Sequence, residues 1–170
     1  MAVLCHKSFS YAGRAAVSSE SCFVAAISIN TREKSYHLIW STIGLPYDCL
    51  YLRNVPRPIG GLLVFSTCSI IHVVQGSPPI GISLNSAAVG AVRFTLKPVQ
   101  NLVATLDGSR CSFFESERCL LALRNGNVYV ITLIHDSAVR SIKDFHFQQV
   151  LNSRYASCIT PLEGNEKQFS

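Results

Sequence analysis

The residues best suited to catalysis in this chain are His135 and Asp136, which are adjacent near the end of a predicted strand. A histidine beside an aspartate suggests a relay that activates a serine nucleophile. Neighbouring strand residues point to opposite faces of a sheet, however, so these two side chains do not readily form one relay. The chain also lacks a G-x-S-x-G elbow and a G-x-x-x-x-G-K-[ST] loop. We therefore predict no catalytic residue and no enzymatic activity.

The histidines do not predict a metal site, because none has an i+4 partner or a close cysteine in the spacing of zinc sites. His72 within SIIHVV and His146 within FHF are predicted to be packed or rim residues. Neither a metal nor another cofactor is predicted. The full set is His6, His37, His72, His135 and His146.

The cysteines favour a reducing compartment, since there are seven of them, no CxxC pair and no N-x-S/T sequon. Most have apolar neighbours, which predicts small buried hydrophobic residues in preference to disulfides or metal ligands. They are Cys5, Cys22, Cys49, Cys68, Cys111, Cys119 and Cys158.

The elements that must position these residues are predicted to be β-strands. The chain has 170 residues, 48% hydrophobic and 15% charged, which is enough for one sizeable core. Aliphatic residues dominate and charged helical periodicity is scarce, as expected for strands buried on both faces. Residues 58–92 carry no charge, but glycines, prolines and polar residues break this run into pieces too short for a membrane span.

The clearest local pattern runs from Leu102 to Ile134. Turns at Asp107-Gly108, Ser116-Glu117 and Asn125-Gly126 separate four apolar segments. Such turns join antiparallel strands, so the pattern predicts a four-stranded meander. Its predicted strands are LVATL, RCSFF, CLLAL and NVYVITLI.

A meander of this kind is the blade of a β-propeller. An earlier, looser set is predicted from SCFVAAISIN, YHLIWS, LLVFS and SIIHVV, with residues 45–58 as an excursion, and a third set begins at residues 140–147. We therefore predict an all-β fold: a partial β-propeller of about three four-stranded antiparallel blades. The WD signature is divergent, since Trp40 precedes Ser41, and a β-sandwich is the structural alternative.

Two clusters of aromatic and basic residues could contact RNA through stacking and phosphate binding. The formal charge of +5 is compatible with this, but the basic residues never form a run, and strand alternation explains the second cluster equally well. Specific binding residues are therefore left unassigned. The clusters are Tyr47, Tyr51, Arg53 and Arg57, and Arg140, Lys143, Phe145 and His146.

A collinear series of motifs resembles the large subunit of the cleavage and polyadenylation specificity factor, in its N-terminal propeller region, over roughly nine tenths of the chain. Glycine and proline turns within it, such as Gly60-Gly61, are predicted to be structural first and to shape exposed loops second. The motifs are Ala12-Gly13-Arg14, residues 24–30, Trp40-Ser41, Leu45-Pro46-Tyr47-Asp48-Cys49, Val55-Pro56-Arg57-Pro58-Ile59-Gly60-Gly61, Pro78-Pro79-Ile80-Gly81, Leu84-Asn85-Ser86 and residues 126–147.

The resemblance implies a nuclear, non-enzymatic scaffold of pre-mRNA cleavage and polyadenylation. It implies WD-repeat and zinc-finger partner subunits that read the AAUAAA signal, while RNA binding by this chain is expected to be indirect or weak. No membrane association is expected. Two alternatives stay open: a related propeller scaffold in splicing, DNA-damage recognition or ubiquitin-ligase assembly, and a β-rich enzyme whose active residues lie elsewhere.

The resemblance also sets the expected domain boundaries. Residues 1–11 are an unmatched N-terminal segment, residues 12–162 are the partial propeller and residues 163–170 are a polar tail. Closing a propeller ring takes four to eight blades, so we expect a fragment with uncovered terminal blades and poor stability in isolation.

Overall fold

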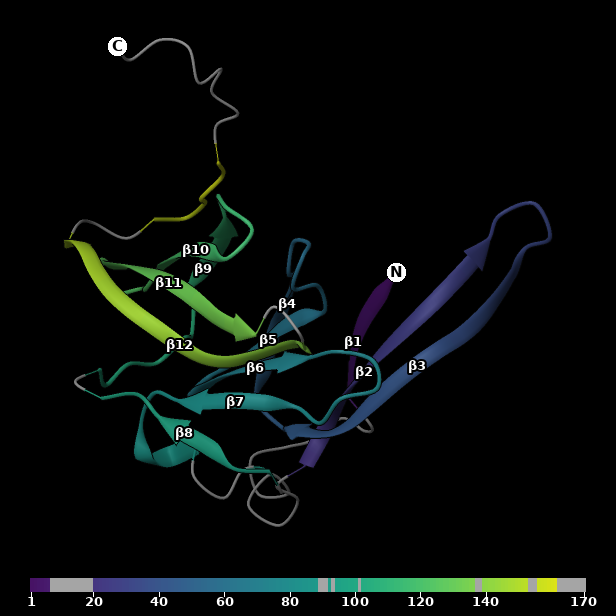
Figure 1. Cartoon of the computed structure of the whole chain (residues 1–170), viewed down its shortest axis with the longest axis horizontal. Coiled ribbons are helices and arrows are strands. Elements are labelled where there is room, and N and C mark those ends of the chain that lie inside the picture. Colours follow the sequence, from purple (N-terminus) through teal and green to yellow (C-terminus); the bar gives the residue numbers. More distant parts are fainter. Residues whose placement is uncertain are drawn as a thin grey trace, which may run out of the picture.

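Three β-sheets lie side by side in the computed structural model (Figure 1). The structure describes residues 1–6, 20–88, 92, 94–100, 102–136, 139–152 and 156–161. Within these ranges the regular elements are strands and one short 3-10 turn, Ser86–Ala88. The predicted all-β class is therefore confirmed, and none of the described sheets is closed. Among the same residues, no helix is long and apolar enough to span a membrane.

The first sheet has the order β1-β2-β3 and is antiparallel. Its strands are β1 (Ala2–His6), β2 (Glu20–Asn30) and β3 (Ser35–Pro46). The predicted strands SCFVAAISIN and YHLIWS correspond to β2 and β3, which form a long hairpin that projects from the rest of the molecule (Figure 1). Sequence reasoning did not predict β1, which pairs with β2 along all five of its residues.

The second sheet has five strands in chain order, with β7 and β8 parallel and the other neighbours antiparallel. The predicted LLVFS and SIIHVV strands correspond to β5 and β6, and every residue of both is buried. Residues 45–58, expected to be an excursion, contain β4. The strands are β4 (Cys49–Asn54), β5 (Leu62–Ser66), β6 (Ser69–Val73), β7 (Ile80–Ser83) and β8 (Leu96–Pro98).

The third sheet is an antiparallel meander with the order β12-β11-β10-β9. A four-stranded meander is predicted here, but the structure has β12 in it and lacks the predicted strand LVATL. The expected third set at residues 140–147 belongs to β12, which pairs with β11 and completes this sheet. The strands are β9 (Arg110–Phe113), β10 (Arg118–Ala122), β11 (Asn127–Asp136) and β12 (Val139–Asn152).

The prediction of a strand over LVATL, residues 102–106, is wrong. Leu102 and Leu106 are buried, which explains the apolar pattern, but their backbone joins no ladder. Instead Leu106 N donates to the Thr67 carbonyl at 2.8 Å and Ala104 N to the Leu84 carbonyl at 3.2 Å. The segment is thus a connection bonded to the β5–β6 turn and to the residue after β7, and the Asp107-Gly108 turn leads from it into β9.

The second sheet is the middle layer, and its two faces line two cores. Leu63 and Phe65 of β5 pack in a cluster with residues of the third sheet, such as Ile131. Val64, between them in the chain, packs with Val24 of the first sheet. Successive strand residues face opposite sides, so a strand covered on both faces must be apolar throughout. This explains the uncharged stretch of the sequence.

The glycine pair before β5 makes a close contact, as the sequence suggested. Gly60 and Gly61 both have positive φ, at 72° and 80°. A Cβ on Gly61 would lie 2.7 Å from His72 Nε2 and 2.7 Å from the Val73 carbonyl oxygen. Only glycine fits both the backbone conformation and the space.

The domain boundaries remain predictions. Residues 2–6 of the expected unmatched segment form β1, whereas the motif Ala12-Gly13-Arg14 and the polar tail at 163–170 lie outside the described residues.

Candidate interaction surface

His135 and Asp136 have separate partners rather than forming a relay. His135 Nε2 lies 2.8 Å from Glu117 Oε1, in the β9–β10 connection. Asp136 Oδ2 lies 2.7 Å from Lys143 Nζ on β12. The hydrogen bond with Glu117 raises the pKa of His135 above its usual range, because the neighbouring carboxylate favours the charged ring. Both pairs tie the end of β11 to its neighbours.

His72 is a packed residue, as predicted. Its side chain is buried on β6, and its Nε2 lies 2.9 Å from the Gly60 carbonyl oxygen. Since a carbonyl only accepts, Nε2 carries the proton. Burial lowers the pKa of His72, and the bond to Gly60 opposes this. The neutral imidazole therefore links β6 to the glycine turn through this hydrogen bond.

The remaining histidines are peripheral. His37 is exposed on β3, and His146 is exposed on β12 at the rim of a groove. His6 Nδ1 lies 3.2 Å from the Cys22 thiol. Within the described ranges, no group of three or more histidine, cysteine or acidic residues could hold a metal ion.

Four of the seven cysteines are buried, in two neighbouring pairs. A hydrogen bond with Cys22, followed by burial, raises the pKa of the Cys49 thiol. Cys111 and burial act in the same way on the pKa of Cys119. Thiols that stay protonated are poor nucleophiles. These cysteines pack as small apolar residues, as the sequence suggested.

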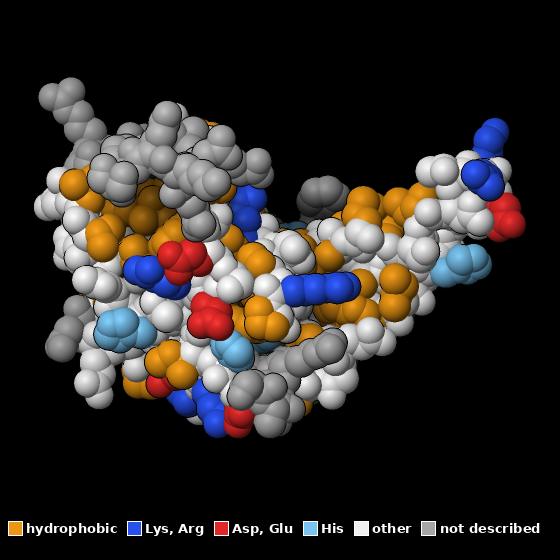
Figure 2. Space-filling view, turned by 45° about the horizontal axis from the view of Figure 1, so that its top comes forward, with side chains coloured by type: hydrophobic (Ala, Val, Ile, Leu, Met, Phe, Trp, Pro, Cys, Tyr) orange, Lys and Arg blue, Asp and Glu red, His pale blue; other side chains and the backbone are white. Residues whose placement is uncertain are grey.

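Five apolar side chains of the β2–β3 hairpin, which we call the arm, are more than half exposed. The exposed fractions are 76% for Tyr36, 62% for Leu38 and 66% for Ile43. Figure 2 shows apolar side chains along the arm, with charged residues gathered at its tip. Ile29 and Ile39 are also more than half exposed. Apolar surface gathered in this way is typical of protein–protein contacts.

The arm is held in shape at both ends. At its base, Val24 and Leu45 are fully buried against the second sheet. At its tip, Asn30 Oδ1 accepts from the backbone N–H groups of Arg32 at 3.1 Å and Glu33 at 3.3 Å. The apolar residues between these ends therefore sit on a preformed hairpin.

The outer edge of the arm is β3, which is the last strand of its sheet and carries no Asp, Glu, Lys or Arg over 12 residues. Proteins usually protect such edges with charges, prolines or bulges, because unpaired edges attract other strands. The β2–β3 pairing has three irregularities and β3 ends at Pro46, but the strand carries no charged residue that would repel another strand.

The first predicted aromatic and basic cluster is only partly brought together. Tyr47 and Arg57 are exposed and lie outside the hollow lined by Tyr51 and Arg53. Tyr51 stacks on Phe65 with ring centroids 4.6 Å apart, and the Arg53 guanidinium lies 5.5 Å from the Tyr51 ring. Arg110, which sequence spacing did not connect to this cluster, lines the same hollow.

Two residues of the second predicted cluster line a groove of about 580 Å³ between residues 97–100 and β12. Phe145 is buried and His146 is exposed, as strand alternation requires, and both line the groove. Lys143 points elsewhere, toward Asp136. The side chain of Arg140 lies outside the described residues.

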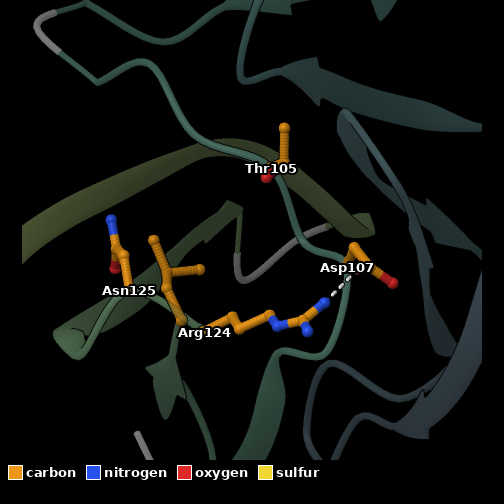
Figure 3. Close-up of a pocket in the computed structure, with 5 residues that line it drawn as sticks. Thr105, Asp107, Arg124 and Asn125 are labelled. Carbon is orange, nitrogen blue, oxygen red and sulfur yellow. Dashed lines mark hydrogen bonds and ion pairs between the residues drawn. The ribbon is translucent and has the colours of Figure 1, made fainter. Parts of the chain in front are cut away.

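A further hollow of about 370 Å³ lies beside the turn before β9 (Figure 3). Two of the polar side chains that line it bond to each other, since Arg124 Nη1 donates to Asp107 Oδ2 at 3.1 Å. The pair is well exposed, so it contributes little to stability.

Sequence comparison identifies the chain's relatives, although no family model matches it. It is 38% identical over 150 residues to cleavage and polyadenylation specificity factor subunit 1 of Drosophila melanogaster. The match covers 88% of this chain and 10% of that protein. The probable subunit 1 of Caenorhabditis briggsae is 33% identical over 148 residues, covering 87% of this chain and 10% of that protein. The Arabidopsis thaliana subunit 1 is 32% identical over 167 residues, covering 98% of this chain and 11% of that protein.

These matches confirm the resemblance carried by the turn motifs. The chain spans about a tenth of the length of these relatives. By sequence, the chain is thus homologous to one segment of the cleavage and polyadenylation specificity factor subunit 1 proteins.

Proposed function

We propose that this chain serves in pre-mRNA 3′-end processing, as part of a non-enzymatic scaffold that helps to assemble the cleavage and polyadenylation machinery in the nucleus. The observation that carries this proposal is the collinear similarity to subunit 1 proteins over 88% of the chain. The names of those relatives describe a cleavage and polyadenylation specificity factor.

The scaffold role is supported by the histidine and cysteine side chains, which have structural partners. His72 bonds to the Gly60 carbonyl, His135 forms an ion pair with Glu117, and the pKa values of the Cys49 and Cys119 thiols are raised. Rigid sheets present a preorganised surface, so binding a partner costs little ordering entropy. These features suit a docking body better than an active site.

The proposed partners are the WD-repeat and zinc-finger subunits of the polyadenylation specificity complex, which would read the AAUAAA signal on this support. Contact of this chain with pre-mRNA is proposed to be indirect or weak. In keeping with this, the Tyr51 ring already stacks on Phe65, which removes a face on which an unpaired base could stack.

We further propose that residues 12–162 are part of a β-propeller and that other strands of the subunit cover the arm. The three sheets are open, and the middle sheet is sandwiched as a propeller blade would be. Because the relatives are about ten times longer than the chain, their remaining length can supply the covering strands.

Affinity purification of the epitope-tagged protein from nuclear extract tests the proposed role. Polyadenylation specificity subunits should be recovered with the wild-type protein. A variant with Leu38→Ser and Ile43→Ser should recover several-fold less, because polar side chains at these exposed positions of the arm would weaken its packing with the covering strands and so disturb assembly of the scaffold. A tip variant, Arg32→Gln with Lys34→Gln, is the control and should behave like wild type.

Two outcomes would contradict the proposal. Recovery of a cullin-type ligase without polyadenylation subunits would favour the DNA-damage alternative, and substrate turnover without partners would favour an enzyme. Equal recovery with the arm and tip variants would show that the apolar surface of the arm is not needed for assembly, while leaving the proposed role in 3′-end processing intact.

A further inference from the structure

A small basic hollow lies at the seam between the second and third sheets, where β4 meets the start of β9. It measures about 350 Å³, within the size range of ligand sites, and is lined by Leu50, Tyr51, Arg53, Gly108, Ser109 and Arg110. The strands β4 and β9 are the edge strands of their sheets. We call this hollow the arginine pocket.

Both guanidinium groups in the arginine pocket are held in place by backbone carbonyls. Arg53 Nε donates to the Cys111 carbonyl at 2.8 Å. Arg110 Nε donates to the Ser157 carbonyl at 3.0 Å, and its Nη1 donates to the Ser109 carbonyl at 2.9 Å. A guanidinium has five N–H donors, so each arginine is oriented and still has donors to offer.

The two positively charged side chains line the same hollow beside Tyr51. The Arg53 guanidinium lies 5.5 Å from the centre of the Tyr51 ring, and Arg110 lines the same hollow. The Tyr51 hydroxyl itself lies 2.9 Å from Ser109 Oγ. The pocket thus combines two cations with a hydroxyl pair.

Carboxylates do not neutralise this charge among the described residues. Their ion pairs join Arg118 to Glu115, Arg124 to Asp107, His135 to Glu117 and Lys143 to Asp136. Two like charges brought together without a counter-ion repel each other, and a bound anion would relieve that repulsion. Arginine forks suit phosphate oxygens especially well.

The surroundings favour a protein segment over RNA as the source of the phosphate. Phe65 stacks on one face of the Tyr51 ring and the Arg53 guanidinium lies over the ring, so the pocket offers no free aromatic face to a base. Two sheet edges flank it, where an extended peptide can add main-chain hydrogen bonds. Leu50, partly exposed at the rim, offers an apolar contact to a neighbouring side chain.

We propose that the arginine pocket binds a phosphorylated serine or threonine of a partner protein segment, with the Arg53 and Arg110 guanidinium groups as its phosphate ligands. Phosphorylation of the partner would then control its docking at the seam between the sheets. This goes beyond the proposed scaffold role and does not depend on it, because the binding is measured on the purified protein.

The probe is a peptide library with a fixed central phosphoserine, compared with the same library carrying serine. We expect the purified protein to retain phosphoserine peptides at least tenfold more strongly. The double variant Arg53→Gln with Arg110→Gln should lose that preference. The control, Arg32→Gln with Lys34→Gln at the arm tip, changes the net charge equally and should bind within twofold of wild type.

Thermal unfolding of each variant separates lost binding from lost folding, since Arg53 also bonds to Cys111. If the double variant does not fold, Arg110→Gln alone carries the test and should weaken phosphopeptide retention several-fold. Equal retention of both libraries, or unchanged retention by a folded pocket variant, would overturn the proposal. Arginine-dependent binding of a single-stranded RNA in preference to the phosphopeptides would overturn it as well.

Discussion

At the scale of single residues, two histidines respond to pH in opposite directions because their surroundings differ. His72 is buried and has one carbonyl acceptor, so its neutral form is favoured. His135 lies beside the Glu117 carboxylate, so its charged form is favoured. Sequence position indicates neither preference, since it depends on partners 12 and 18 residues away.

His72 should make the protein less stable in acid. Its pKa is lowered from 6.5 in the folded protein, so below about pH 6.5 the unfolded chain binds a proton that the folded chain refuses. Stability should therefore fall as the pH drops from 7 to 5, and His72→Gln should flatten that slope. Urea unfolding at several pH values measures this. His37→Gln, on the exposed arm, is the control; a slope unchanged in His72→Gln would refute the assignment.

His135 should do the reverse. Its folded pKa is raised above 6.5, so its ion pair with Glu117 is fully formed below that value and is lost as the pH rises through the raised pKa. A histidine ring titration by NMR should show a lower pKa for His135 in Glu117→Gln than in wild type. Glu115→Gln removes a nearby carboxylate bound to Arg118 and should leave the titration unchanged. An identical midpoint in Glu117→Gln would contradict the pairing.

At the scale of elements, the sequence predicted most strands but misassigned some of their partners. Alternation and Asn-Gly turns identified β10 and β11 because those signals are local. The segment LVATL has the same apolar pattern, yet it forms no strand, and Leu106 N bonds to the Thr67 carbonyl in the turn between β5 and β6. A buried connection and a buried strand look alike in sequence, because both need apolar side chains.

The glycine turn before β5 offers a test at this scale. Gly60 and Gly61 share a positive φ, but a Cβ at Gly60 would meet nothing within 4 Å, whereas one at Gly61 would meet His72 Nε2 and the Val73 carbonyl at 2.7 Å. Gly60→Ala should cost about 1 kcal/mol from backbone strain alone. Gly61→Ala should cost about 3 kcal/mol, because overpacking adds to that strain. Equal losses in chemical denaturation would show that the close contact is absent.

At the scale of the whole molecule, the arrangement of the sheets explains why residues 58–92 carry no charge. The uncharged stretch forms the middle layer, covered by Val24 on one side and Ile131 on the other. The arm extends beyond this body and keeps apolar residues such as Tyr36 in solvent. Sequence reasoning could not find that surface, because the apolar pattern of β3 is the one expected for a buried strand.

The arginine pocket was hidden for a related reason. Tyr51 and Arg53 are close in sequence and were grouped together, but Arg110 joins them only when β9 meets β4. The second predicted cluster, around residues 140–146, is not brought together as a whole. Lys143 pairs with Asp136, whereas His146 lines the groove beside β12. Contacts between sheets follow from packing, which a single sequence does not encode in its spacing.

The proposed role in 3′-end formation is tested most directly by in vitro cleavage of an RNA that contains AAUAAA. Nuclear extract depleted of the protein should lose cleavage at the site downstream of the signal, and adding back the purified complex that contains the wild-type protein should restore it. Cleavage that continues undiminished after complete depletion would contradict the account.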